Sequence, residues 1–251
     1  MKNILNKKLI ERYSRQLVLK DVGPAGQKKI IKSKVLVVGA GGLGCPVIDY
    51  LSRAGVGNIG VIDNDKVNIS NIHRQSLYNS KDIGKFKVNS IKKKIKLINP
   101  QVKIKTFKEN IGKENIEKIF KNYNFIVDGS DNFKTKFLLN KYSLKYKKIL
   151  IVGAISKMDG HIFTFDFKNK TDPCLKCFYQ TEPSDEILNC EYEGILGPVA
   201  GIVGNIQALE VLKKILKIGD KLNNKMLILN LSKLNFRRVG FKKKTTCICK
   251  K

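Results

Sequence analysis

The 251-residue sequence contains no tryptophan, only two histidines, and only six prolines and six arginines. It has no apolar run near the roughly 18 residues that a membrane-spanning helix needs, and its first residues lack the apolar core of a signal peptide. With 42% hydrophobic and 28% charged residues, the composition excludes a disordered, collagen-like or low-complexity chain. We therefore expect a soluble globular protein of the cytoplasm, with a sizeable core and no membrane partner.

Acidic residues are also scarce, because 21 Asp and Glu stand against 49 Lys and Arg, which gives a formal net charge of +28. Such a charge attracts nucleic acids or acidic proteins. However, 43 of the basic residues are lysine and 22 further residues are asparagine. Surfaces that recognise phosphates favour the arginine fork. We therefore favour compositional drift of an A/T-rich coding sequence over a nucleic-acid footprint, and expect no specific nucleic-acid partner.

Strands and helices alternate over residues 34–154. Apolar strands are expected at 34–38, 58–63, 102–107, 124–128 and 149–154. Helices are expected between them at 43–54, 85–98, 114–120 and 132–146. This alternation predicts an α/β fold with a Rossmann-like, mainly parallel sheet.

The pattern changes after about residue 155. Residues 161–166 alternate with period two, which is typical of an antiparallel strand, and two more strands are expected at 226–231 and 236–241. A polar loop is expected over 168–197, followed by a helix at 198–216. No repeat or linker divides the chain, so we expect a single domain over 1–251 in which antiparallel strands continue the parallel sheet.

The motif GAGGLG (39–44) follows the first strand and opens a helix. Glycines there let the backbone approach a phosphate, and the helix N-terminus supplies N–H donors. Asp63 ends the next strand, 22 residues beyond Gly41, where an acid can accept from ribose hydroxyls. Alone, this pattern fits NAD or FAD as readily as ATP, and a tight turn without a ligand is the remaining alternative.

The residues after Asp63 favour ATP. Arg74, within SNIHRQ (70–75), and Lys87 place a guanidinium and an ammonium where a dehydrogenase has no need of them. Attack on an α-phosphate does need them, because negative charge accumulates on the phosphoryl oxygens. DGSDN (128–132) adds acids for a metal ion at the end of a strand. Solvated surface charge is the alternative for both basic residues, and it is weaker for the rare arginine.

Four of the six cysteines form two tight pairs about 70 residues apart. These are Cys174, Cys177, Cys247 and Cys249. Such spacing suits a four-thiolate metal site better than disulfides, and thiols without a ligand are the alternative. Cys45 lies in an apolar helix and is expected in the core. Cys190 lies among acids that do not lower the pKa of a thiol.

Seven motifs stand in order along the chain: RYSRQ (12–16), GAGGLGCP (39–46), AGVGNIGVIDND (54–65), VNISNIHRQ (67–75), DGSDN (128–132), CLKC (174–177) and NCEYEGILGPVAGIVGNIQALE (189–210). In this ordered set the chain resembles the MoeB/ThiF/HesA family of adenylyltransferases, which are related to the ubiquitin-activating enzymes. The resemblance covers nearly the whole chain, from about residue 10 to residue 249.

The resemblance implies an enzyme that binds Mg-ATP and a small ubiquitin-like sulfur carrier protein, which presents an acidic face and a Gly-Gly tail. The terminal carboxylate of the carrier attacks the α-phosphate, giving an acyl-adenylate and pyrophosphate. No general base is required, because a carboxylate is already ionised at neutral pH. The family reading assigns 34–154 to the nucleotide and 155–251 to the carrier and a structural zinc ion.

The resemblance also implies roles for single residues. The catalytic set is Arg15, Arg74, Lys87, Asp131 and Cys190. The nucleotide-binding set is Gly39, Gly41, Gly42, Gly44, Asp63, Asp65, Ser70, Asn71, Arg74, Lys87, Asp131 and Asn132. Within these sets Asp131 holds magnesium, Arg15 reaches the partner subunit's ATP in a homodimer, and Cys190 can bond covalently to the carrier or a sulfur donor. Zinc is assigned to the four paired cysteines, although the tail pair is one residue shorter than the family's.

Other functions remain open at this stage. A nucleotide-binding scaffold without turnover would not need Arg74, Lys87 and Asp131 together, and an NAD-dependent oxidoreductase leaves SNIHRQ and the cysteine pairs unexplained. A nucleic-acid binder rests on charge alone. The motifs do not distinguish thiamine, molybdopterin and tRNA-thiolation pathways. We expect the sulfur to come from a separate donor or sulfurtransferase.

Overall fold

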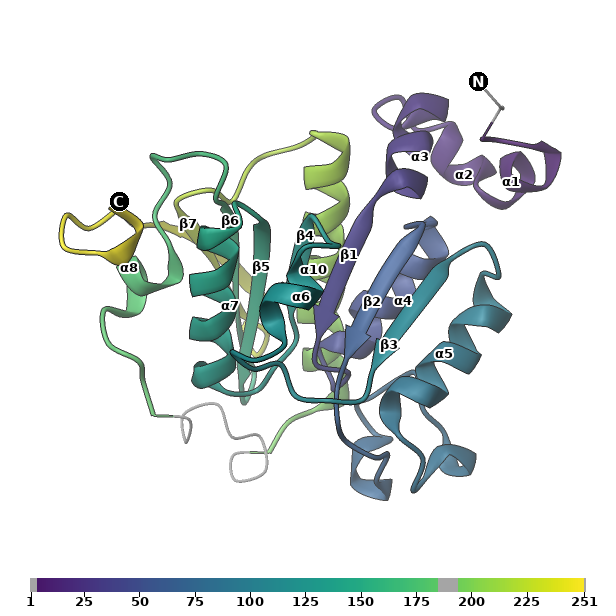
Figure 1. Cartoon of the computed structure of the whole chain (residues 1–251), viewed down its shortest axis with the longest axis horizontal. Helices are drawn as coiled ribbons and strands as arrows, with labels where there is room; N and C mark the ends of the chain where they lie inside the picture. Colours follow the sequence, from purple (N-terminus) through teal and green to yellow (C-terminus); the bar gives the residue numbers. More distant parts are fainter. Residues whose placement is uncertain (1–3, 185–193, 251) are drawn as a thin grey trace.

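Eight strands form one sheet in the computed structural model, which describes residues 4–184 and 194–250 (Figure 1). The order across the sheet is β3-β2-β1-β4-β5-β6-β7-β8. The strands are β1 (Lys34–Val38), β2 (Asn58–Ile62), β3 (Lys103–Phe107), β4 (Phe125–Asp128), β5 (Ile149–Ser156), β6 (Asp159–Asp166), β7 (Lys225–Asn230) and β8 (Asn235–Gly240).

The sheet changes direction at β5. The pairs β3–β2, β2–β1, β1–β4 and β4–β5 are parallel, whereas β5–β6, β6–β7 and β7–β8 are antiparallel. The predicted fold class, a parallel sheet continued by antiparallel strands, is confirmed. Parallel strands are buried on both faces, which explains why β1 and β4 read as continuous apolar runs.

Nine α-helices lie within the described residues. They are α1 (Lys7–Arg12), α2 (Ser14–Leu17), α3 (Gly23–Lys32), α4 (Gly44–Ala54), α5 (Lys87–Ile98), α6 (Ile116–Phe120), α7 (Phe133–Lys145), α8 (Leu175–Tyr179) and α10 (Gly197–Leu216). Short 3-10 turns add η1 (Ile69–Asn71), η2 (Ser80–Asp82) and η4 (Ile248–Lys250). The expected loop over 168–197 is wrong at α8, a helix of five residues.

Two apolar layers enclose the sheet. Helices α3, α4, α5 and α10 pack on one face, and α6, α7 and α8 pack on the other, where Figure 1 shows α6 and α7 in front of the strands. Cys45 is fully buried in the first layer, as expected. Within residues 4–184 and 194–250, the helices lack the combination of length and hydropathy that a membrane crossing requires.

Candidate active site and cysteine cluster

A cleft of about 600 Å³ opens at the carboxyl ends of the parallel strands. Strand β1 pairs with β2 on one side and β4 on the other, so the strand order reverses there, which is where open parallel sheets bind ligands. The predicted site residues that line the cleft are Gly39, Gly41, Gly42, Asp63, Asp65, Asn71, Arg74, Lys87, Asp131 and Asn132. Residues distant in the sequence therefore meet in one place.

The glycine turn needs glycine for steric reasons. Gly39 has φ +89°, and a Cβ there would lie 2.7 Å from the carbonyl oxygen of Gly129. A Cβ at Gly44 would lie 2.0 Å from the carbonyl oxygen of Gly39. Gly44 thus lets α4 begin directly beneath the turn, and it packs under the turn rather than lining the cleft.

Asp63 connects the turn to the loop after β2. Its Oδ2 accepts from the N–H of Ala40 (2.7 Å), and its Oδ1 accepts from the N–H of Asp65 (2.8 Å). Burial raises the pKa of Asp63, while the nearby Lys87 ammonium lowers it. The carboxylate is therefore fixed at the mouth of the cleft with oxygen lone pairs left for a ligand hydroxyl.

Two cations face the cleft, Arg74 from the loop after η1 and Lys87 from the first position of α5. The Lys87 ammonium is buried and lies 2.7 Å from Asp65 Oδ2. Arg74 Nη1 donates to the Ser70 carbonyl (2.7 Å) and lies 2.9 Å from His73 Nε2. Ser70 is not among the cleft-lining residues, and its carbonyl instead orients Arg74. Together these cations make the cleft suitable for an anionic group.

Asp131 lies in the turn between β4 and α7, beside Asn132. The Asn132 side chain accepts from the N–H of Thr135 and so caps α7, and its amide lies 3.3 Å from Asp131 Oδ1. The cap therefore fixes the end of the turn that joins α7. The Asp131 carboxylate is exposed at the cleft, and oxygen ligands of this kind suit Mg²⁺.

Sequence reasoning missed a buried ion pair under this turn. Lys136 Nζ lies 3.1 Å from Asp128 Oδ2 and donates to the carbonyls of Ser130 (2.7 Å) and Gly153 (2.7 Å). All three ammonium protons therefore have acceptors, and the Asp128 Oδ1 accepts from Ser130. The pair fastens the turn that carries Asp131 to the ends of β4 and β5. Its only signal was a lysine four residues after Asn132.

The loop after β3 was also missed. Residues Glu109 to Ile111 line the cleft opposite the turn after β4, and Asn115 Nδ2 holds this loop through Glu109 Oε2 (2.8 Å) and the Asn110 carbonyl (2.7 Å). The position of this segment at the carboxyl end of β3 was the available signal, because parallel strands end at the same edge.

Of the two remaining predicted catalytic residues, the structure places one outside the cleft and does not describe the other. Arg15 is exposed on α2 and does not line it. Cys190 lies outside the described residues.

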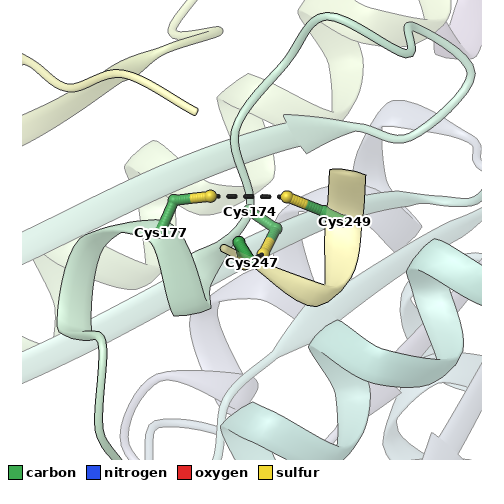
Figure 2. Close-up of side chains that lie close together, drawn as sticks. All are labelled: Cys174, Cys177, Cys247 and Cys249. Carbon is green, nitrogen blue, oxygen red and sulfur yellow. Dashed lines mark hydrogen bonds between the residues drawn. The ribbon is translucent and has the colours of Figure 1, made fainter. Parts of the chain in front are cut away.

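The two cysteine pairs meet between α8, which packs against α7, and the C-terminal segment. Figure 2 shows the four side chains converging from α8 and from the C-terminal segment around η4. The Sγ atoms all lie within 4.8 Å of one another, with Cys174–Cys247 at 3.5 Å and Cys177–Cys249 at 3.4 Å.

This cluster has the dimensions of a zinc site. Four thiolates at about 2.3 Å from a tetrahedral zinc ion would be about 3.8 Å apart. Burial raises the pKa of Cys174 to about 11, so a bound cation is needed to hold that thiol ionised at neutral pH. The shorter tail pair therefore does not prevent the four sulfurs from forming a metal-sized cage.

Comparison with known proteins identifies relatives. Residues 13–249 match the ThiF family. The chain is 36% identical over 245 residues to a sulfur carrier protein adenylyltransferase of Thermus thermophilus, covering 96% of this chain and 90% of the relative. It is 38% identical over 228 residues to a probable molybdopterin-synthase adenylyltransferase of Gracilaria tenuistipitata var. liui, covering 91% of this chain and 64% of the relative.

A third relative is longer than this chain. The adenylyltransferase and sulfurtransferase MOCS3 of Anopheles gambiae is 38% identical over 245 residues, which is 97% of this chain and 55% of the relative. The chain thus spans just over half the length of that protein.

Solved structures give the same fold. E. coli MccB with MccA-N7isoAsn superposes with a TM-score of 0.84 at 23% identity, covering 98% of this chain and 76% of that chain. The structure of E. coli MccB with ATP gives a TM-score of 0.82 at 23% identity, covering 95% of this chain and 74% of that chain. At this identity the likeness concerns the fold alone.

Proposed function

Because this chain belongs to the ThiF family, we propose that it is an ATP-dependent adenylyltransferase of a small ubiquitin-like sulfur carrier protein ending in Gly-Gly. One observation carries the proposal: a single cleft is lined by the glycine turn, Asp63, Arg74, Lys87 and Asp131. An acid for ribose, two cations for phosphates and a carboxylate for a metal ion are the groups that this reaction requires.

In the proposed reaction the terminal carboxylate of the carrier attacks the α-phosphorus of ATP. A bond forms between a carboxylate oxygen and this phosphorus, and pyrophosphate leaves with the electrons of the broken P–O bond. Arg74 and Lys87 neutralise the charge that develops on the phosphoryl oxygens. Gly42 and the start of α4 receive the phosphates, and Asp63 accepts from the ribose hydroxyls. Asp65 holds Lys87 toward the cleft through their 2.7 Å ion pair.

Two metal ions fit the residues present. Asp131 would hold Mg²⁺, which supplies charge neutralisation for the phosphate chain when bound. Cys174, Cys177, Cys247 and Cys249 would hold a structural zinc ion, and the sulfur spacing described above supports this assignment. The zinc ion would fasten the C-terminal segment to α8.

We place the chain in a homodimer in which Arg15 reaches the partner's ATP. The support is that Arg15 is exposed away from its own cleft, beside an apolar hollow of about 460 Å³ lined by Gln16, Tyr50, Leu209 and Leu212, among others. Tyr50 and Leu209 are 52% and 54% exposed and line this one hollow together with Leu212, and apolar side chains that gather in one place mark an interaction surface. A second copy of the chain is the expected cover.

The cellular setting follows from the same proposal. The chain would act as one domain over 1–251 in the cytoplasm, where reducing conditions keep a four-cysteine site free of disulfides. The names of the relatives, a sulfur carrier protein adenylyltransferase and a probable molybdopterin-synthase adenylyltransferase, favour sulfur carrier activation for the molybdenum cofactor, with thiamine as the alternative. A separate sulfurtransferase would then supply the sulfur, and Cys190 would serve that later transfer.

Exchange of labelled pyrophosphate into ATP tests the proposal. We expect exchange that requires Mg²⁺ and a carrier with an intact Gly-Gly end, and none with a carrier that lacks its last glycine. Asp131→Ala should abolish exchange, whereas Cys190→Ala should leave it largely intact, since adenylation precedes sulfur transfer. ATP binding without any exchange would favour a scaffold instead, and equal loss in both variants would contradict the assigned roles.

A further inference from the structure

Three side chains hold Ala40, which lies fully buried inside the glycine turn. Its N–H donates to Asp63 Oδ2 (2.7 Å). Its carbonyl accepts from the Tyr78 hydroxyl (2.8 Å) and the Cys45 thiol (3.4 Å). The peptides on both sides of Ala40 are therefore fixed in orientation.

The Tyr78 bond determines where Gly41 points its N–H. A trans peptide is planar, so the Ala40 carbonyl and the Gly41 N–H point in opposite directions. Tyr78 and Cys45 draw the carbonyl into the core, and Gly41 lines the cleft. The Gly41 N–H is consequently turned toward the cleft. Within the described residues this N–H donates to no backbone carbonyl.

Tyr78 also connects this turn to a second part of the site. It follows Arg74 by four residues, and its N–H donates to the Gln75 carbonyl (3.1 Å). The Gln75 amide in turn lies beside Gly41. One buried ring thus joins the segment that carries Arg74 to the turn that faces the same cleft.

We propose that Tyr78 is a positioning residue for the phosphate chain of a bound nucleoside triphosphate. Its hydroxyl aims the Gly41 N–H at the phosphates and keeps the turn in register with Arg74. The proposal rests on the proposed function for the identity of the ligand. It goes beyond that function because Tyr78 itself touches no part of the cleft surface and acts through Ala40 and Gly41.

The substitution Tyr78→Phe separates this role from packing. Phenylalanine keeps the buried ring but removes the hydroxyl, which leaves the Ala40 carbonyl with only the weak thiol donor of Cys45. Burial raises the pKa of Tyr78, so the wild-type hydroxyl keeps its proton and donates throughout the working pH range.

A matched control is Thr164→Val. Thr164 Oγ1 donates to Glu210 Oε2 (2.8 Å), and both residues are buried between β6 and α10. This variant also loses one buried hydroxyl bond with little change of shape, but outside the residues that line the cleft. A general loss of stability should affect both variants alike.

Calorimetric titration of the full chain with Mg-ATP and with adenosine, without a carrier, tests the proposal. For Tyr78→Phe we expect the Kd for ATP to rise roughly fivefold to twentyfold, as loss of a well-aligned hydrogen bond predicts, and the Kd for adenosine to change by less than about twofold. Thr164→Val should change neither Kd by more than about twofold.

Three outcomes would overturn the proposal: unchanged ATP affinity in Tyr78→Phe, equal loss of ATP and adenosine affinity, or equal loss in Thr164→Val. Failure of the proposed function would look different. A wild-type chain that binds ATP but exchanges no pyrophosphate would refute adenylyl transfer and leave this comparison intact, whereas one that binds no ATP would refute both.

Discussion

Asp63 is a proposed ribose-binding residue whose ionised form makes the fold less stable. Burial against the glycine turn raises its pKa above the ordinary value of 3.8, although Lys87 opposes this. The folded chain therefore holds this proton more tightly than the unfolded chain does. The resulting stabilisation is complete below the unfolded pKa and is lost as the pH rises through the folded pKa. Ionised Asp63 thus lowers the free energy of unfolding at neutral pH.

Replacing Asp63 by Asn removes this titration. The free energy of unfolding of Asp63→Asn, relative to wild type, should therefore shift in favour of the variant between about pH 4 and about pH 7. Urea unfolding at several pH values measures the difference, in which the other titrating groups cancel.

Asp220→Asn is the control for this series. The Arg238 side chain hydrogen-bonds to the exposed Asp220 and lowers its pKa, so this carboxylate stabilises the fold above its unfolded pKa and that stabilisation is lost as the pH falls. The free energy of unfolding of Asp220→Asn, relative to that of wild type, should therefore decrease as the pH rises. Equal signs in the two series would contradict the role of burial at Asp63.

The contrast between Arg74 and Lys136 shows which site residues a sequence can reveal. Arg74 is one of six arginines and stands within a motif, so its residue type carries information. Lys136 is one of 43 lysines, and nothing in its neighbourhood distinguishes it from solvated charge. Only its burial and its contacts with Asp128 and Gly153 reveal its role. Tyr78 was missed for the same reason, because a contact with residue 40 has no local pattern.

Among the elements, strands were easier to predict than short helices. β1 has the expected bounds, and the other expected strands begin and end within two residues of the observed ones, because a buried strand leaves a continuous or alternating apolar pattern. The largest differences, two residues each, are at the end of β5, which extends to Ser156, and at the start of β6, which begins at Asp159 directly after the turn. Helix α8 was missed because five residues cannot form a stable helix alone. It depends on the cysteine cluster and on Leu175, which is buried in the core.

The cysteine cluster should bind one zinc ion per chain. Truncation after residue 245 removes Cys247 and Cys249, so it should abolish zinc binding and lower the Tm, because α8 and the tail lose their shared cross-link. Elemental analysis of protein purified without a chelator measures the zinc content, and Cys45→Ala is the control that should retain it. Absence of zinc in the full chain, or full retention after truncation, would contradict a four-cysteine cage.

At the scale of the whole molecule, the sequence predicts the fold class but not the neighbours of each strand. The position of the cleft depends on β1 lying between β2 and β4, and these pairings join segments that are about 25 to 90 residues apart. The same applies to Arg15, whose place in a proposed dimer depends on a surface formed by α2, α4 and α10. Such contacts arise from tertiary packing and leave no periodic pattern in the chain.

The positive charge is also a property of the whole molecule. Exposed lysines occur on elements as different as α5, with Lys92, Lys93 and Lys96, and the edge strand β3, with Lys103 and Lys105. Arginine is rare throughout, and among the described residues the cleft and the apolar hollow are each lined by a single arginine. This distribution indicates a broad positive field rather than a surface that reads nucleic acid.

A broad field of this sign should accelerate encounter with an acidic carrier protein, because electrostatic steering acts on the association rate over distances comparable to the screening length. We therefore expect carrier association, measured by stopped-flow fluorescence, to slow markedly as the ionic strength rises to about 0.15 M, where screening shortens to about 8 Å. The dissociation rate should change much less, since it depends on contacts already formed. Oligonucleotides at the same salt should bind weakly and lose affinity steeply as more salt is added. A tight, salt-resistant oligonucleotide complex that excludes the carrier would show instead that the charge serves nucleic-acid binding.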